Sequence, residues 1–190
     1  RMFPQTSPLT LVDIGGNTGR FSKAFLLRFP EAKAVIADLP VEVDALPRRP
    51  ELAEVRARLS GVAIDWLTPD ELTDRPQAEG ADLYWMSQFL DCFSETEAVS
   101  ILTRTRRAMT QNSRLAVLEP IVDEQRHRAA ELSLAATSLY FTVLANGNSK
   151  FFNGAELRRI FAAAGFAIES EHPDLGVSHT LFILRPENAF

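Results

Sequence analysis

The sequence predicts a doubly wound α/β domain, in which a mostly parallel sheet of seven strands carries helices on both faces. Two observations predict this class: short apolar runs alternate with segments of helical periodicity, and a glycine-rich turn joins the first apolar run to the first helix. Strands that alternate with helices pair in parallel, because each crossover helix returns the chain to the same end of the sheet. The expected strands are residues 9–14, 34–37, 61–64, 83–86, 114–118, 167–169 and 180–184.

The first strand runs into the sequence LVDIGGNTG at residues 11–19. Glycine at such a junction lets the backbone turn sharply and approach a ligand, and the following helix offers free N–H groups and the positive end of its dipole. Asn17 stands where a second spaced glycine is expected, and asparagine tolerates the left-handed conformation. The pattern predicts a nucleotide-cofactor loop formed by Asp13, Gly15, Gly16, Asn17 and Gly19; the alternative is a turn whose glycines serve packing only.

The second strand ends in an acidic residue, Asp38, nineteen residues beyond Gly19. A carboxylate at this place in a βαβ unit accepts hydrogen bonds from the ribose hydroxyls of an adenosine cofactor. The spacing therefore predicts that Asp38 binds ribose.

Later segments show where helices begin. Ser94 precedes Glu97, and Asn153 precedes Glu156, by three residues each, which is the pattern of a capping box. We expect one helix over residues 95–109 and a second after Asn153. Prolines interrupt residues 40–79, so short helices and loops are expected there, and residues 129–145 form a long, mostly apolar helical pattern.

Composition narrows the classes of function. The 190 residues are 46% hydrophobic, enough for one domain with a substantial core, and the net charge is −5. Basic residues form no extended patch, which argues against nucleic acid as a partner. Cys92 is the single cysteine, so an internal disulfide is impossible and a cytoplasmic location is expected. The three histidines lack metal-ligand spacing, and no apolar run is long enough to span a membrane.

Several motifs together resemble those of class I S-adenosylmethionine-dependent methyltransferases, particularly the small-molecule O-methyltransferases of plant phenolic and bacterial polyketide pathways. The motifs are DIGGNTG at 13–19, FP at 29–30, DLP at 38–40, SQFLDCFS at 87–94, LAVLEP at 115–120, FNGAEL at 152–157 and AGF at 164–166. The SQFLDCF string is also similar to methyltransferases associated with bacterial aryl-polyene pathways. The resemblance implies a Rossmann-like methyltransferase fold and S-adenosylmethionine as cofactor.

The resemblance also implies where the donor binds. Asp38 and Leu39 lie at its ribose, Asp65 and Trp66 match an acid and an apolar side chain that enclose the adenine, and the fourth strand adds Ser87 and Gln88. These residues follow strand ends, where ligands of doubly wound sheets bind. An exposed Trp66 is expected for adenine stacking; ordinary core packing is the alternative.

The predicted catalytic residues depart from the family's pattern. Asp91 stands where the family carries its catalytic histidine, and Phe151 stands where it carries a second carboxylate, whereas Glu119 retains the acid at the end of the fifth strand. One interpretation is that burial raises the pKa of Asp91 so that it removes a phenol proton. A second is that the acceptor needs no base, as in ring C-methylation. A third is that Asp91 caps the helix near Ser94 or faces water.

The predicted function is methyl transfer to a small aromatic or polyketide-like acceptor, at a phenolic oxygen. The alternatives are ring C-methylation, a catalytically silent binding module and an NAD-dependent oxidoreductase. The strand pattern starts within the first ten residues, whereas the family carries a helical N-terminal domain that dimerises. We therefore expect residues 1–190 to be the catalytic domain of a longer, homodimeric protein, with an uncovered apolar face in residues 129–144.

Overall fold

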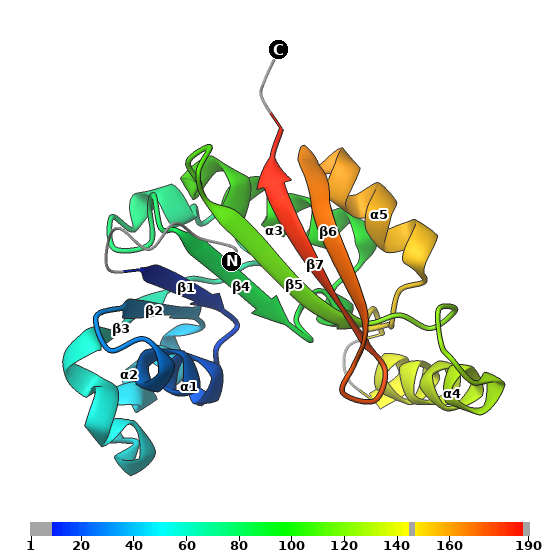
Figure 1. The fold of residues 1–190 in the computed structure, drawn as a ribbon, viewed down its shortest axis with the longest axis horizontal. Coiled ribbons are helices and arrows are strands. Elements are labelled where there is room, and N and C mark those ends of the chain that lie inside the picture. Colours follow the sequence, from blue (N-terminus) through cyan, green and yellow to red (C-terminus); the bar gives the residue numbers. More distant parts are fainter. Residues whose placement is uncertain (1–8, 145–146, 188–190) are drawn as a thin grey trace. The chain divides into compact units, whose positions relative to one another are not determined.

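A computed structural model describes residues 9–144 and 147–187 of the chain. In this part, seven strands form one mixed sheet with the order β3-β2-β1-β4-β5-β7-β6 (Figure 1). The fold class predicted from the sequence is confirmed. The elements in chain order are β1 (Thr10–Ile14), α1 (Arg20–Arg28), β2 (Lys33–Asp38), α2 (Pro40–Ala45), η1 (Leu46–Arg48), η2 (Pro50–Arg58), β3 (Leu59–Ala63), η3 (Leu72–Asp74), β4 (Leu83–Ser87), η4 (Leu90–Cys92), α3 (Glu95–Ala108), β5 (Arg114–Pro120), α4 (Arg128–Leu144), α5 (Gly154–Ala163), β6 (Phe166–Leu175) and β7 (His179–Pro186), where η marks a 3₁₀ helix.

The chain divides into two compact units, and the first comprises Arg1–Trp85 and Arg107–Ser113. In it β1, β2 and β3 pair in parallel, with Val12 opposite Val35 and Ile36 opposite Gly61. Four residues of β1 and four of β2 are buried, as expected for parallel strands covered by helices, whereas only Val62 of β3 is buried. The predicted irregular stretch at 40–79 is confirmed, because α2 and the 3₁₀ helices η1, η2 and η3 are all short.

Arg58 ties η2 to the end of α1. Its guanidinium donates hydrogen bonds to the carbonyl oxygens of Leu26, Phe29 and Ala32 at 3.0–3.2 Å. The last carbonyl groups of a helix have no partner within the helix, and a cation there also meets the negative end of the dipole. Arg58 thereby fixes the helix that follows the glycine-rich turn.

The second unit comprises Met86–Arg106 and Arg114–Phe190. Here β7 pairs antiparallel with both β5 and β6, so these three strands depart from the parallel pairing of the first unit. β6 and β7 are also longer than the sequence predicted, because the antiparallel hairpin extends beyond its buried residues into polar ones. Both predicted capping boxes are confirmed: Ser94 exchanges hydrogen bonds with Glu97, and Asn153 with Glu156.

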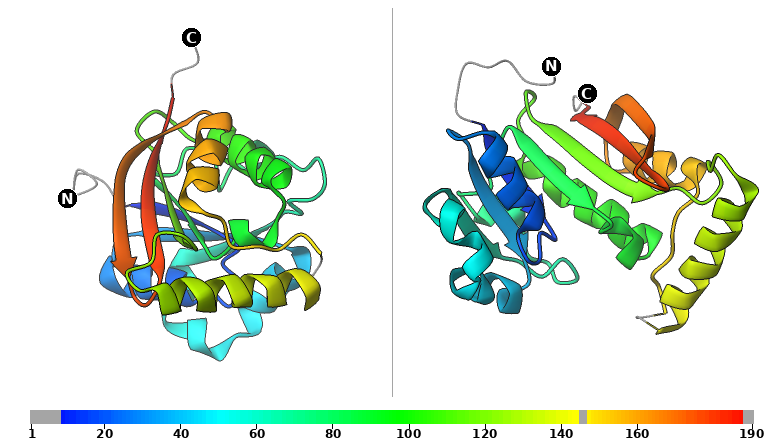
Figure 2. Two further views of the ribbon diagram at one scale, coloured as in Figure 1. Left: turned by 90° about the vertical axis from the view of Figure 1, so that its right-hand side faces the viewer. Right: turned by 60° about the horizontal axis from the view of Figure 1, so that its bottom comes forward.

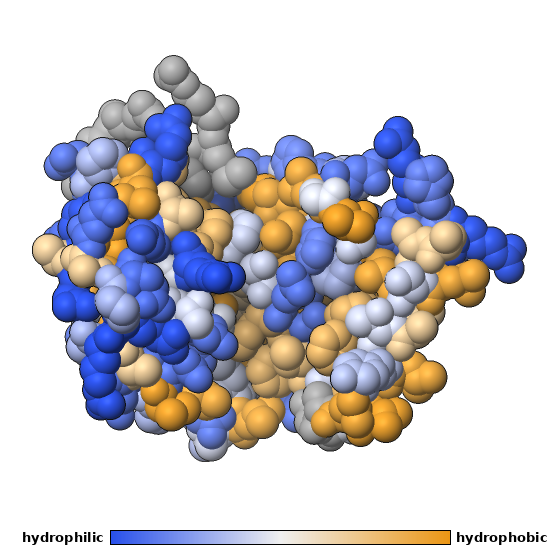
Figure 3. Space-filling view, turned by 90° about the horizontal axis from the view of Figure 1, so that it is seen from below, coloured by the Kyte–Doolittle hydropathy of each residue, from blue (hydrophilic) through white to orange (hydrophobic). Residues whose placement is uncertain are grey.

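α4 differs from the other long helices because none of its residues is buried. Figures 1 and 2 show it projecting from the end of the β5-β7-β6 strands instead of packing on their face. Its large apolar side chains are exposed, including Leu139 at 66% and Val143 at 72%, and Figure 3 shows hydrophobic side chains gathered over this helix. The uncovered apolar face predicted for residues 129–144 is confirmed; Ala145 lies outside the described residues.

Within the described part of the chain, no helix is both long and apolar enough to cross a membrane.

Candidate functional site

The glycine-rich loop between β1 and α1 is built around a buried carboxyl group. Asp13 is 2% exposed, and its Oδ2 accepts a hydrogen bond of 2.6 Å from the Ser22 hydroxyl. Burial raises the pKa of Asp13 to about 6, the Ser22 hydrogen bond opposes the rise, and the charge of Asp38 adds to it. Through this hydrogen bond Asp13 connects the end of β1 to the start of α1, on either side of the loop. Its carboxyl holds a proton more tightly than that of an exposed aspartate.

The loop needs its glycines for conformation and for space. Gly15 and Gly19 have φ of 68° and 76°, and Asn17 takes φ of 45°, as the sequence predicted for a left-handed residue. A Cβ on Gly16 would lie only 2.8 Å from the Cγ of Asp13, and a Cβ on Gly19 would lie 3.1–3.2 Å from Ile36 and Leu52. The loop thus forms a cradle of bare backbone, which is the surface that an adenosine-type cofactor requires.

Asp38 lies at the end of β2, directly against this loop. Its Oδ2 accepts the N–H of Asn17 at 2.7 Å, and its Oδ1 accepts the N–H of Leu39 at 2.8 Å. A carboxylate has about four acceptor positions, so about two remain for other donors. The cradle and this carboxylate together fit the ribose end of S-adenosylmethionine.

Asp65 and Trp66 follow β3 in the same unit. Asp65 is half-buried, and its Oδ1 accepts the N–H of Leu67 at 2.9 Å. Trp66 is only 5% exposed, so the expectation of an exposed tryptophan is wrong. The apolar ring is packed into the core of its own unit, which is where burial of so large an apolar surface is most favourable.

In the second unit, the last residue of β4, Ser87, and the turn that follows it carry the remaining predicted residues. Ser87 is half-buried, and Gln88 is exposed with φ of 48°, an uncommon conformation for a residue other than glycine. The N–H of Gln88 donates to the carbonyl oxygen of Leu118 at 2.9 Å, which fixes the turn to β5.

Asp91 and Glu119 are the buried acids of this unit, at 8% and 1% exposure. Glu119 Oε1 accepts two hydrogen bonds of 2.9 Å from the N–H groups of Phe89 and Leu90. Burial raises the pKa of both carboxyl groups, and for Glu119 the negative charge of Asp91 raises it further. The pKa direction that the sequence suggested for Asp91 is confirmed.

The third interpretation of Asp91, as a helix cap or a water-facing side chain, is wrong. Ser94 and Glu97 supply the cap of α3, and Asp91 is buried in η4, where its Oδ1 receives the Cys92 thiol at 3.5 Å. Burial raises the pKa of that thiol to about 12, so it stays neutral and acts as a donor.

Phe151, at the position of the family's second carboxylate, belongs to a segment joined to α4. Its N–H donates to Ser138 Oγ at 2.9 Å, and its ring lies 5.9 Å from that of Phe141. The adjacent Lys150 donates its backbone N–H to the carbonyl oxygen of Asp91 at 2.9 Å. This segment therefore places an apolar ring, in place of an acid, on the side of the unit that holds Asp91.

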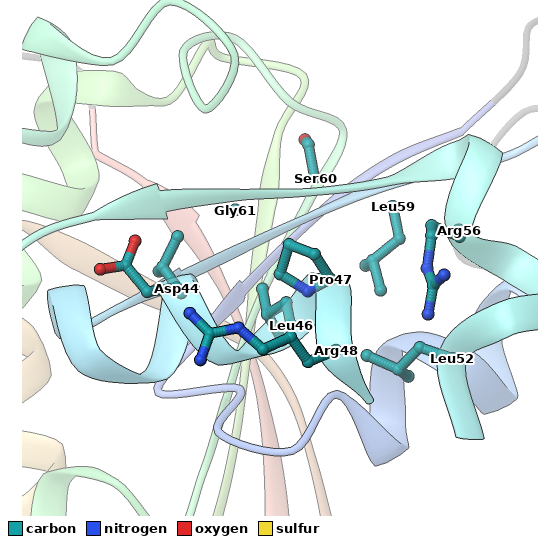
Figure 4. Close-up of a pocket in the computed structure, with 10 residues that line it drawn as sticks. Asp44, Leu46, Pro47, Arg48, Leu52, Arg56, Leu59, Ser60 and Gly61 are labelled. Atoms are coloured by element: carbon teal, nitrogen blue, oxygen red, sulfur yellow. The ribbon is translucent and has the colours of Figure 1, made fainter. Parts of the chain in front are cut away.

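A separate pocket of about 390 Å³ lies in the first unit (Figure 4). Its lining residues come from α2, η1, η2 and the beginning of β3, and they include the charged Arg48 and Arg56 and the apolar Leu46 and Leu52. The predicted donor residues instead follow the carboxyl ends of the strands. We therefore do not assign this pocket to the methyl donor.

Among residues 9–144 and 147–187, no group of three or more histidine, cysteine, aspartate or glutamate side chains is arranged to hold a metal ion. The prediction that no metal is used remains a prediction.

The family model for the O-methyltransferase domain matches residues 5–167. The chain belongs to this family. The resemblance that its motifs indicated is thereby confirmed.

Known members show how this O-methyltransferase domain compares in length. It is 31% identical over 161 residues to O-methyltransferase SfmM3 of Streptomyces lavendulae, which is 84% of this chain and 46% of the relative. The crystal structure of LaPhzM matches with a TM-score of 0.79 at 26% identity, over 96% of this chain and 52% of that one. NcsB1 from neocarzinostatin biosynthesis, solved with S-adenosyl-L-homocysteine and 1,4-dihydroxy-2-naphthoic acid, shares the fold at 22% identity and a TM-score of 0.76 over 97% of this chain and 51% of that one. The chain spans about half the length of the curated relatives it matches.

Two features of this O-methyltransferase domain were missed by sequence reasoning. Ser22, one turn into α1, holds the Asp13 carboxyl, and Phe21 stacks on Trp85 with ring centroids 4.0 Å apart. An apolar residue and a serine in an amphipathic helix carry no signal that separates these roles from ordinary packing.

Proposed function

We propose that this chain binds S-adenosylmethionine through its first unit and is the catalytic domain of an enzyme that methylates a phenolic oxygen of a small aromatic or polyketide-like acceptor. The observation that carries the proposal is the cradle of Gly15, Gly16 and Gly19 beside the Asp38 carboxylate, whose Oδ2 lies 2.7 Å from the N–H of Asn17. Membership of the O-methyltransferase family supports the same reaction.

The donor, when bound, supplies a methyl group activated by its sulfonium charge. In the proposal Asp38 accepts the ribose hydroxyls, because about two of its acceptor positions are not used by the protein. The loop backbone and Leu39 surround the sugar, and Asp65 and Trp66 bind the adenine, although Trp66 is only 5% exposed. For Ser87 and Gln88, which belong to the second unit, a role in donor binding stays a prediction of the family resemblance. Such positioning is the main requirement of an in-line displacement.

For the acceptor, we assign proton removal to Asp91 and the support of Asp91 to Glu119. A phenol must lose its proton as its oxygen takes the methyl group, and a buried carboxylate of raised pKa is a suitable base. Phe151 stands where the family's pattern has a second carboxylate. Its ring, which lies against that of Phe141, offers an apolar surface to an aromatic acceptor. Ring C-methylation remains the alternative outcome, since it does not require the base.

Calorimetry with S-adenosylhomocysteine tests the donor site directly. Asp38→Ala should weaken binding by roughly ten- to a hundredfold, because a charged hydrogen-bond acceptor contributes about 1.5–3 kcal/mol. Asp74→Ala, an exposed acid in η3 of the same unit, is the matched control and should bind as the parent does. Equal affinity in the folded Asp38 variant and the parent would remove Asp38 from the site. Tight binding of NAD instead would favour the oxidoreductase.

Two further parts of the proposal concern the whole protein. We propose that the full-length protein is a homodimer of cytoplasmic location, with an N-terminal helical domain beside the apolar face of α4. Sedimentation of the full-length protein as a monomer would contradict the dimer.

A further inference from the structure

The two oxygens of Glu119 have unequal surroundings. Oε1 accepts the N–H groups of Phe89 and Leu90, both at 2.9 Å. Oε2 is buried and forms no hydrogen bond with any atom of the described residues. The side chain as a whole is 1% exposed, so bulk water does not solvate this oxygen.

This asymmetry distinguishes the two protonation states of Glu119. An ionised carboxylate carries negative charge on both oxygens, and burial of one without a donor is strongly unfavourable. A carboxylic acid carries no net charge, and its carbonyl oxygen is the natural acceptor for two N–H groups. An Oε2 hydroxyl also has no acceptor among the described residues, but an unpaired neutral O–H costs less than an unpaired buried charge, so the geometry favours the acid with Oε1 as its carbonyl oxygen.

The charged and titratable groups around Glu119 favour the same state. Asp91 repels a second negative charge, and the Cys92 thiol is neutral and donates to Asp91 Oδ1 at 3.5 Å. Lys150 does not compensate the pair, because its Nζ is bound to Glu95 and Glu156. No ion pair with Asp91 or Glu119 is present in the described part of the chain.

We propose that the pair of Asp91 and Glu119 carries one proton in total, that Glu119 holds this proton on Oε2, and that Asp91 is the ionised member which removes the acceptor's proton. This inference rests on the proposed function only for its last part. Glu119 is then a positioning residue: it fixes the turn that carries Asp91 and keeps a second negative charge out of the pair.

The proposal defines the proton's route. As the bond between sulfur and the methyl carbon breaks and the bond from oxygen to carbon forms, the phenol O–H bond breaks and its proton moves to the Asp91 carboxylate. Both carboxyl groups are then protonated. Asp91, the more exposed of the two, returns its proton to solvent before the next turnover, whereas Glu119 keeps its own.

Carbon NMR of the side-chain carboxyl groups tests this without an acceptor. The full-length protein is labelled with ¹³C at aspartate and glutamate carboxyl groups, and the two resonances are assigned by their loss in Asp91→Asn and Glu119→Gln. At neutral pH we expect the chemical shift of a carboxylic acid for Glu119 and of a carboxylate for Asp91. Glu54→Gln, an exposed glutamate of η2, is the control and should change neither resonance.

The Glu119→Gln variant supplies the second measurement. If Glu119 is already neutral, removal of its ionisable group leaves the titration midpoint of Asp91 within about half a pH unit of the parent value. If Glu119 is ionised in the parent, loss of its charge lowers the Asp91 midpoint by roughly one unit or more. An ionised Glu119 resonance at neutral pH, or that downward shift, overturns the proposal.

Calorimetry with S-adenosylhomocysteine on the same samples separates this inference from the proposed function. Failure to bind the nucleoside would refute the proposed donor site while leaving the two carboxyl resonances as a test of the pair. Normal binding of S-adenosylhomocysteine together with an ionised Glu119 would refute only the proposal that Glu119 carries the proton of the pair.

Discussion

Replacement of Asp13 by asparagine should make the stability of the free protein less dependent on pH. Burial raises the pKa of Asp13 from 3.8 to about 6 in the folded state. The folded protein therefore binds this proton more tightly than the unfolded chain does. The stability that the protonated Asp13 carboxyl contributes is fully present below pH 3.8 and is lost as the pH rises through about 6.

The magnitude follows from the size of the shift. The difference between about 6 and 3.8 is about 2 pKa units, which corresponds to about 3 kcal/mol at 1.36 kcal/mol per unit. The side chain is 2% exposed, so solvent screening does little to reduce this value. Asparagine keeps an oxygen for the Ser22 hydroxyl and cannot ionise, so Asp13→Asn should not lose these 3 kcal/mol.

Urea unfolding of the parent and the variant at several values between about pH 3 and pH 8 measures the effect. Between the lowest and the highest pH, the free energy of unfolding of the variant should rise by about 3 kcal/mol relative to that of the parent. A difference in stability that is the same at every pH does not affect this comparison. Asp74→Asn, an exposed acid, should show no such gain. Parallel pH dependences for the parent and Asp13→Asn would refute the reasoning, because they would mean that Asp13 ionises as freely in the folded state as in the unfolded chain.

Three further predictions concern packing. Gly16→Ala should weaken S-adenosylhomocysteine binding at least about tenfold in calorimetry, since its Cβ would lie 2.8 Å from Asp13 Cγ and displace the loop. Tyr84→Phe should lower the free energy of unfolding by roughly 1–3 kcal/mol in urea, because the Ala78 carbonyl oxygen loses the hydroxyl at 2.7 Å, whereas the Ala108 carbonyl oxygen keeps the N–H of Gly80. Leu139→Ser with Val143→Ser should change that free energy by less than about 0.5 kcal/mol per substitution and reduce light scattering on concentration, since both side chains are exposed. A large loss of stability in the double variant would show that this face of α4 is covered.

The features that could be predicted from the sequence are those set by a few consecutive residues. The loop at Gly15–Gly19 and the caps at Ser94 and Asn153 depend on local backbone conformation, which short motifs specify. The fold class, a mostly parallel sheet of seven strands with helices on both faces, followed from the alternation of strands with helices and from the family resemblance.

The features that could not be predicted depend on residues far apart in the chain. Glu119 accepts hydrogen bonds from the N–H groups of Phe89 and Leu90, which lie 30 and 29 residues earlier in the chain, and no local sequence pattern predicts such a contact. Trp66 beside Asp65 has the same local sequence whether its ring is exposed or packed, so its burial appears only once the unit is assembled. β6 and β7 extend as far as the hydrogen bonds between them continue, so both strands include polar end residues whose composition does not predict a strand.

The place of β7 has a consequence for synthesis of the protein. β7 lies between β5 and β6 although it follows both in the chain, and each pairs with it antiparallel. β5 therefore has no partner on this side until β7 is made about 60 residues later, which takes roughly 3–12 s at ribosomal rates. During that interval the edge of β5 has open N–H and C=O groups that another chain can pair with. A ribosome that pauses before Thr180 prolongs this exposure, so the speed of translation over the hairpin influences how much of the protein escapes aggregation.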